Sequence, residues 1–226
     1  MRRGRIARGV VHAAATLAGF CAVTGASLAQ SAPPPGQLPF DYYVLALSWS
    51  PGFCDLGGDE KSPQQCAAGS GEGFVVHGLW PNNLRSENPE DCNPDADVSP
   101  AELAAASGLY PTKGLALHEY MTHGTCAGLS AADYFATVRS VRDQLRIPRS
   151  LVAPHEELRL SPDEIEQAFI AANANLTPDN IAVTCARGEL LDVRFCVSRD
   201  LKAFSACPKV SGHTCHRRSI SVAPVR

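Results

Sequence analysis

The sequence predicts an α+β fold, with a mainly antiparallel sheet packed against helices and cross-linked by disulfides. Strand-like and helix-like segments occur in mixed order, without the regular strand–helix–strand repeat that a parallel sheet requires. Eight of the nine cysteines lie beyond residue 29, and an even number is what a disulfide framework needs. Past the Pro-rich residues 33–35 there is no long polar linker, repeat or low-complexity tract, so residues 30–226 are expected to form one domain.

Four segments rich in apolar, aromatic and β-branched residues are predicted strands, at residues 42–50, 74–80, 181–186 and 189–197. The second is bounded by Gly73 and Pro81, which mark its ends. Only Arg187 and Gly188 separate the third from the fourth, so these two are expected to form a hairpin.

Helices are predicted where a serine is followed three residues later by an acid, the pattern of an N-terminal cap. This pattern occurs at Ser99 with Glu102, at Ser130 with Asp133 and at Ser161 with Glu164. Ser130 is expected to open a helix over residues 131–145, and Ser161 is expected to open one that ends at about residue 174. A further helix is expected over residues 115–122, ending before Gly124.

Residues 1–29 have the pattern of a secretory signal peptide that is removed on export. Four arginines precede an apolar run over residues 10–26, and the small residues needed for cleavage follow it. A membrane anchor is the alternative, but Thr16, Gly19, Thr24 and Gly25 interrupt a run that is already short for a span of about 20 apolar residues. We therefore expect the mature chain to be free of the membrane.

Export and cysteine number together favour disulfides, which form in oxidising compartments. No two of the eight cysteines are separated by only two residues, the spacing typical of a zinc knuckle. Loss of residues 1–29 removes four arginines and no acid, so the formal charge of −3 becomes −7. A chain this acidic lacks a general basic surface for nucleic acid, which favours an enzyme with a few local contacts over a binding module.

Two short segments carry the residues on which function is expected to depend. His77 lies in the run FVVHGLWP, and His118, Glu119 and His123 lie in the run HEYMTHGTC. Glu119 and His123 are four residues apart, so on a helix they share a face and the carboxylate can orient the imidazole. His77 ends a predicted strand beside Gly78, which leaves room for a ligand. Two imidazoles and a carboxylate suit metal-free acid–base chemistry on a phosphodiester.

Other interpretations of these side chains fit less well. The histidines of a helical zinc-protease motif are four residues apart, whereas His118 and His123 are five apart. No serine stands in a nucleophile-elbow context, and the cysteines are expected to be oxidised, so covalent catalysis is disfavoured. His155 is expected at the surface, and His213 and His216 are expected to be solvated in a cationic stretch near the C-terminus.

The two segments resemble the active-site segments of the ribonuclease T2 family of secreted acid ribonucleases. The resemblance extends to YYVLALSWSPGFC, to SPDEIEQAF and to the paired cysteines near the C-terminus, so it covers most of residues 30–226. It implies an α+β fold and endonucleolytic cleavage of RNA without a metal or other cofactor.

The resemblance also implies a role for each residue of the two segments. His77 and His123 are expected to be the catalytic pair, with Glu119 supporting the transition state and His118 binding phosphate. Trp80 is expected in the base-binding site, where a flat ring stacks on any base and gives little selectivity.

Two substrate-binding positions depart from the pattern of the family. Thr122 stands where a lysine is common, which removes a cation expected to stabilise the charge of the phosphorane. Asn82 stands where an aspartate is common, and this is expected to alter the base preference. Tyr120, in place of a common tryptophan, is a milder change.

By the same resemblance, four disulfides are expected to join Cys54 with Cys66, Cys92 with Cys126, Cys185 with Cys215, and Cys196 with Cys207. The spacing of eight cysteines alone leaves on the order of a hundred pairings open.

We therefore expect a monomeric endoribonuclease, periplasmic or extracellular, that cleaves single-stranded RNA with low base specificity. The 2′-hydroxyl is an internal nucleophile, so the protein must remove its proton and protonate the leaving 5′-oxygen. His123 is assigned as base and His77 as acid, giving a 2′,3′-cyclic phosphate that water opens to a 3′-phosphate. DNA lacks the hydroxyl and is not expected to be cut.

Two alternatives remain open on the sequence alone. One is a secreted RNA-binding or inhibitory protein on the same fold, whose catalysis is weakened through Thr122. The other is a metal-dependent phosphoesterase that uses the same histidines. Retention of His77, His118, Glu119 and His123 together argues against the first.

Overall fold

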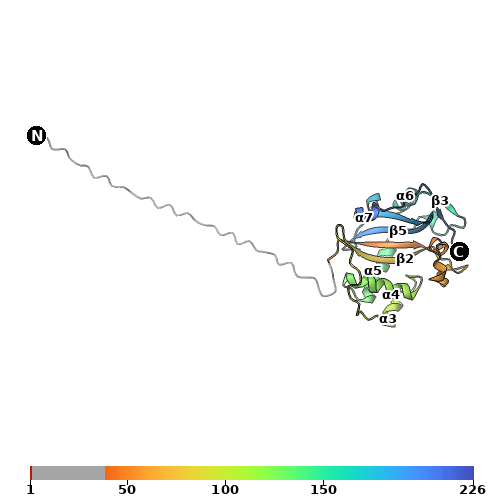
Figure 1. Cartoon of the computed structure of the whole chain (residues 1–226), viewed down its shortest axis with the longest axis horizontal. Helices are drawn as coiled ribbons and strands as arrows, with labels where there is room; N and C mark the ends of the chain where they lie inside the picture. The colour runs from red at the N-terminus through yellow and green to blue at the C-terminus, as the bar shows by residue number, and fades with distance from the viewer. Residues whose placement is uncertain (2–38) are drawn as a thin grey trace. The chain divides into compact units, whose positions relative to one another are not determined.

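The architecture is a central, mainly antiparallel sheet with helices around it, seen in a computed structural model that describes residue 1 and residues 39–226 (Figure 1). The predicted signal peptide and residues 30–38 lie outside the described residues. The strands are β1 Tyr42–Trp49, β2 Phe74–Asn82, β3 Leu158–Leu160, β4 Ile181–Ala186, β5 Glu189–Ser198 and β6 Ile220–Val222. The α-helices are α1 Ser50–Asp55, α2 Pro63–Cys66, α3 Pro100–Ala105, α4 Lys113–Thr122, α5 Ala131–Gln144, α6 Pro162–Ala172 and α7 Pro208–Ser211. Short 3₁₀ turns are η1 Gly58–Glu60, η2 Gly124–Ala127, η3 Arg149–Leu151 and η4 Pro178–Asn180.

The sheet has the strand order β2-β1-β5-β6-β3, and β4 pairs with β5 on a separate branch. β1 is antiparallel to both β2 and β5, so Tyr42 lies opposite Asn82 on one side and Ser198 on the other. β5 and β6 form the one parallel pairing among the described strands. The predicted α+β class with a mainly antiparallel sheet is confirmed.

Local sequence signals account for the longer elements. Ser99, Ser130 and Ser161 accept hydrogen bonds from the backbone N–H three residues on, which satisfies a donor that the first turn leaves free. The predicted hairpin is also present, because Arg187 and Gly188 have φ of 51° and 95°, as a two-residue turn with both φ positive requires.

Strand β2 runs two residues beyond its predicted end. Pro81 lies opposite Tyr43 inside the pairing with β1 and does not break it. β2 is an edge strand, so the missing N–H of proline costs no ladder hydrogen bond on the open side.

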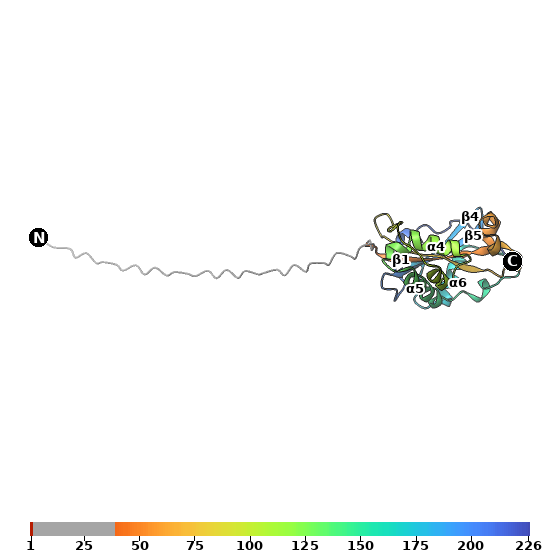
Figure 2. The same ribbon diagram turned by 90° about the horizontal axis from the view of Figure 1, so that it is seen from below.

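The hydrophobic core lies between one face of the sheet and helices α5 and α6, which occupy the same side in Figure 2. Phe135 and Val138 of α5 and Phe169 of α6 are fully buried there, against Leu45 and Phe195 of the sheet. The Phe169 and Phe195 rings pack 5.2 Å apart. Because this face is filled by helices, a site can form only on the opposite face or at an edge. In the part of the chain described, no helix has the length and apolar character needed to cross a membrane.

Four disulfides cross-link this framework, and they are the pairs that the resemblance implies. The bonds join Cys54 to Cys66, Cys92 to Cys126, Cys185 to Cys215, and Cys196 to Cys207. The second ties the loop after β2 to η2, the turn that directly follows α4.

Candidate active site

His77 is presented by an irregularity in β2. Ala46 pairs with Gly78 and Leu47 pairs with Val76, so His77 is an extra residue with no partner on β1. Such a β-bulge turns a side chain out of the regular pleat. The His77 side chain is 38% exposed and faces α4.

Gly78 allows α4 to approach the strand closely. A Cβ atom at this position would lie 2.1 Å from both Glu119 Oε2 and Trp80 Nε1. These two atoms occupy the space that a side chain would need, so only glycine permits their contact at this point.

Glu119 lies at the centre of the site and brings the two imidazoles together. Its carboxylate is buried and accepts a hydrogen bond of 2.7 Å from Trp80 Nε1. Its Oε1 lies 3.8 Å from His77 Nε2, and its Oε2 lies 4.0 Å from His123 Nε2. Burial raises the pKa of Glu119, although the hydrogen bond from Trp80 and the neighbouring histidines oppose this shift.

The indole of Trp80 lies between the two imidazoles. Its ring centroid is 5.2 Å from that of His77 and 5.5 Å from that of His123. The guanidinium of Arg194 on β5 lies 5.3 Å from the same indole, within the range of a cation–π contact. The hydrogen bond from Trp80 Nε1 to Glu119 fixes the orientation of the indole ring.

Asp192 of β5 contacts the His77 ring nitrogen that does not face Glu119. This contact was not predicted from the sequence. Asp192 Oδ1 lies 3.4 Å from His77 Nδ1 and accepts a hydrogen bond of 2.5 Å from Ser48 Oγ. The backbone N–H of Asp192 donates to Thr184 Oγ1 at 3.0 Å. Burial alone would raise the pKa of Asp192, but hydrogen bonds from His77 and Ser48 and the nearby cations hold it below its usual value.

The two imidazoles differ in basicity. Burial lowers the pKa of His77, but the hydrogen bond and charge of Asp192, with the charge of Glu119, outweigh burial and raise it above 6.5. Burial, together with the charges of His118 and His77, lowers the pKa of His123 to about 4, although the charge of Asp91 opposes this shift. At a pH between the pKa of His123 and the pKa of His77, His77 carries a proton and His123 does not. The pair can therefore donate one proton and accept another at the same pH.

The remaining predicted substrate-binding residues lie around this pair in different ways. His118 is exposed on α4, and its charge lowers the pKa of both Glu119 and His123. Asn82 is buried, and its side-chain amide donates to the backbone oxygens of Trp80 and Pro81.

A cavity of about 260 Å³ opens beside His123, and Trp80, Asn82, Glu90 and Arg194 also line it, whereas His77 does not. Thr122 is not among its lining residues; it ends α4, where its backbone oxygen accepts a hydrogen bond from Asp91 N. Arg194 is the one permanent cation among the described residues that line this cavity.

Alternation along β5 was the available signal for Asp192 and Arg194, since both fall on the polar side of the predicted strand.

Within residues 39–226, no group of three or more His, Cys, Asp and Glu side chains is arranged to hold a metal ion.

Comparison with known proteins gives a consistent result. The model of the ribonuclease T2 family matches residues 40–207. A probable ribonuclease from Haemophilus influenzae is 36% identical over 154 residues, which are 62% of this chain and 57% of the relative. A ribonuclease from Aeromonas hydrophila is 39% identical over 112 residues, which are 50% of this chain and 49% of the relative. The chain thus spans about half the length of these two bacterial relatives.

More distant similarities cover more of the fold. Ribonuclease DdI from Dictyostelium discoideum is 27% identical over 193 residues, which are 78% of this chain and 82% of the relative. The structure of an RNase-related protein from Calystegia sepium superposes with a TM-score of 0.65 at 20% identity, over 84% of this chain and 100% of that one. The structure of RNase NT in complex with 5′-AMP superposes with a TM-score of 0.58 at 19% identity, over 84% of this chain and 98% of that one.

Proposed function

The chain belongs to the ribonuclease T2 family, whose model matches residues 40–207, and we propose that it is an endoribonuclease that cleaves single-stranded RNA by metal-independent acid–base catalysis. The observation that carries this proposal is the placement of two imidazoles of opposite pKa shift on either side of one buried carboxylate. Acid–base catalysis requires one protonated and one unprotonated group at the same pH, and this arrangement supplies both.

In the proposed reaction, neutral His123 removes the proton of the 2′-hydroxyl, and protonated His77 donates a proton to the leaving 5′-oxygen. The directions of the two pKa shifts support this assignment over the reverse one. The 2′-oxygen bonds to phosphorus as the 5′-oxygen leaves, which gives a 2′,3′-cyclic phosphate. Water then opens the ring to a 3′-phosphate, with the roles of the two histidines exchanged.

Two neighbouring groups support the transition state in this proposal. Glu119 lies within 4.0 Å of both imidazoles, with one carboxylate oxygen near each, so its charge favours the protonated form of whichever ring holds the proton. Asp192 acts as a positioning residue, because it contacts His77 on the nitrogen that does not face Glu119.

Low base specificity follows from the way in which a base would enter the cavity. Trp80 offers an aromatic face, and stacking on such a face is open to every base. Asn82 already uses its amide N–H groups on backbone oxygens, which leaves its side-chain oxygen for a base.

We also propose that the protein is exported and acts in the periplasm or outside the cell. Four disulfides support this, because such bonds persist in oxidising compartments.

The test of the function is cleavage of matched RNA and DNA oligonucleotides with and without a chelator. We expect RNA to be cut to 2′,3′-cyclic and then 3′-phosphate ends with or without chelator, and DNA to remain intact. Activity lost with chelator would favour a metal-dependent phosphoesterase. Tight RNA binding without cleavage would favour a catalytically weakened binding or inhibitory protein.

Thr122→Lys is expected to raise kcat by about 10-fold, equivalent to about 1.4 kcal/mol of added transition-state stabilisation from a cation beside His123. Lys113 does not supply this charge from α4, because it begins the helix that Thr122 ends. Thr122→Met is the matched control, since it adds length without charge. Equal steady-state kcat for the two variants would contradict the prediction and leave Arg194 as the cation of the site.

A further inference from the structure

A second hollow lies next to the cavity of the active site. Its volume is about 300 Å³, and Lys209 and His213 form part of its wall. Asn82, Asn88 and Arg194 line both hollows, so the two are adjoining parts of one surface depression. A chain that occupies the first hollow can therefore continue past Arg194 into the second.

The second hollow is cationic on a protein that is acidic overall. The chain has 20 Lys and Arg against 23 Asp and Glu, yet none of the described residues that line this hollow is acidic. Arg194 and Lys209 are both permanent cations, and one terminal nitrogen of Arg194 lies 3.4 Å from Asp192 Oδ2. Lys209 Nζ donates one hydrogen bond to Ser86 O at 2.8 Å, which leaves two of its three N–H groups for a ligand. Arg194 Nε is buried without a hydrogen-bond partner in the part of the chain described.

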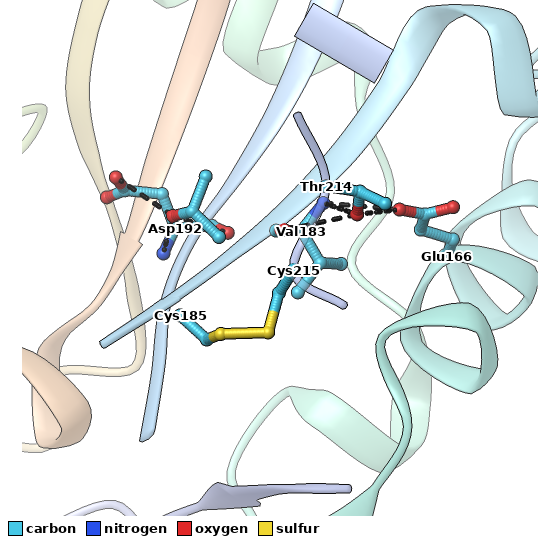
Figure 3. Close-up of a disulfide and its surroundings, with 7 residues drawn as sticks. Glu166, Val183, Cys185, Asp192, Thr214 and Cys215 are labelled. Atoms are coloured by element: carbon cyan, nitrogen blue, oxygen red, sulfur yellow. Dashed lines mark hydrogen bonds between the residues drawn. A yellow bond between two sulfur atoms is a disulfide. The ribbon is translucent and has the colours of Figure 1, made fainter. Parts of the chain in front are cut away.

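The wall that carries Lys209 and His213 is held firmly in place. Disulfides fix residues 207–215 at both ends, to β5 through Cys196–Cys207 and to β4 through Cys185–Cys215. Figure 3 shows the second of these bonds beside the contact between Thr214 and Glu166 of α6. Thr214 Oγ1 donates to Glu166 Oε1 at 2.6 Å.

Within the wall, His213 also contacts the backbone of Lys209. His213 Nδ1 donates to Lys209 O at 2.6 Å, and the His213 side chain is exposed. The backbone that carries Lys209 is thus held by two disulfides, and Arg194 lies on strand β5, so both cations project from ordered backbone, which lowers the entropic cost of binding a ligand.

We propose that this second hollow binds a phosphate of the RNA chain next to the one that is cleaved, with Lys209 and Arg194 as its cations. The inference rests on the proposed ribonuclease function and extends it, because it assigns a subsite to the flanking nucleotide. An anionic group of the substrate is the ligand that the charge of the hollow favours. Because the chain is acidic overall, electrostatic repulsion elsewhere on the protein would favour binding of the RNA backbone in these two hollows.

The test compares substrates that differ by one phosphate. A dinucleoside monophosphate contains only the phosphate that is cleaved, whereas trinucleotides extended on the 5′ or the 3′ side contain one more. For Lys209→Gln, the ratio of kcat/KM for one of the trinucleotides to kcat/KM for the dinucleoside should fall about 5-fold, as expected for losing one partly exposed charge–phosphate contact. The slope of log kcat/KM against log salt for that trinucleotide should weaken by about 0.7.

Two control variants separate charge from structure. Lys209→Arg keeps the charge and should have the same ratio of kcat/KM values as the wild type. A ratio as low as that of Lys209→Gln would mean that the hydrogen bond to Ser86 O matters and the charge does not, which would overturn the subsite. Lys202→Gln removes one exposed cation beside a different cavity, lined by Leu45 and Phe204, and should leave the ratio unchanged.

The outcomes distinguish this inference from the function on which it rests. An unchanged ratio for Lys209→Gln with both trinucleotides would overturn the subsite while cleavage itself persists. Absence of dinucleoside cleavage by the wild-type protein would instead overturn the proposed function. Inhibition by inorganic phosphate that is weakened by Lys209→Gln, without a change in the substrate ratio, would show a site for free phosphate and would also overturn the RNA subsite.

Discussion

Alanine at His77 or at His123 is expected to lower kcat for RNA cleavage by about 100-fold to 10,000-fold, the range for loss of one general acid or base. The two imidazoles lie near different oxygens of Glu119 and come from different elements, so neither can take over the position of the other. A steady-state assay on an RNA oligonucleotide measures the effect. The double variant should lose less than the product of the two single losses, because groups that act as a unit are not additive.

The pH profile gives each histidine its own signature. The wild-type kcat/KM should rise as His123 loses its proton near its pKa of about 4, and should fall as His77 loses its proton at a pKa above 6.5. The signs follow from the roles, since a base must be neutral and an acid must be charged. Each alanine variant should lose the limb of its own residue, although a coupled pair yields apparent pKa values that belong to both groups.

His155→Ala is the matched control for these variants, because His155 is exposed between η3 and β3 and outside the site. It should retain the kcat and the pH profile of the wild type. Wild-type turnover in His77→Ala or in His123→Ala would contradict the assignment of the pair. Loss of activity with an intact profile in either would point to misfolding, which circular dichroism separates from a catalytic effect.

The sequence predicted the parts of the site that depend on local spacing. Glu119 and His123 share a helix face because they are four residues apart, and the structure places them 4.0 Å apart. The strand that carries His77 was likewise visible in its apolar run, but the expectation that His77 ends the strand was wrong, because β2 continues to Asn82. The bulge that turns His77 toward α4 was not predictable, because it depends on the pairing of β2 with β1 and not on β2 alone.

Contacts between distant strands were out of reach for the same reason. Asp192 and Arg194 lie among the polar positions of a predicted strand, and no local pattern indicates which residues of β1 and β4 lie opposite them. A register shift in the β4–β5 pairing after Thr184 leaves Leu191 without a partner on β4 and partly exposed. The fully buried residue is Leu190.

Short elements were also missed, since their stability comes from tertiary contacts. Strands β3 and β6 have three residues each, and helix α7 has four. Segments this short have no period to detect, and α7 is held by two disulfides that flank it. Pairing of β3 with β6 depends on residues 60 positions apart, such as Leu160 and Ile220.

Asp192→Asn is expected to lower kcat/KM at neutral pH by about 10-fold, because the hydrogen bond to His77 is retained but loses its charge, a difference of roughly 1 to 1.5 kcal/mol. Asp192 raises the pKa of His77 through its charge and its hydrogen bond, against the opposing effect of burial. Without that charge, burial prevails and the pKa of His77 falls. Less of the enzyme then carries the proton that the leaving oxygen needs.

The position of the alkaline limb decides whether Asp192 acts through His77. In Asp192→Asn this limb should move to lower pH, while the acid limb of His123 stays near pH 4, because Asp192 is not among the groups that set the pKa of His123. The asparagine oxygen can still accept from His77 Nδ1, so the ring orientation is retained and the loss reports on charge. Asp200→Asn makes the same chemical change at an exposed turn after β5 and should leave both limbs in place. A uniform fall in kcat/KM at every pH would instead show that the Asp192 carboxylate only holds the sheet together by accepting from Ser48 Oγ and Thr184 Oγ1.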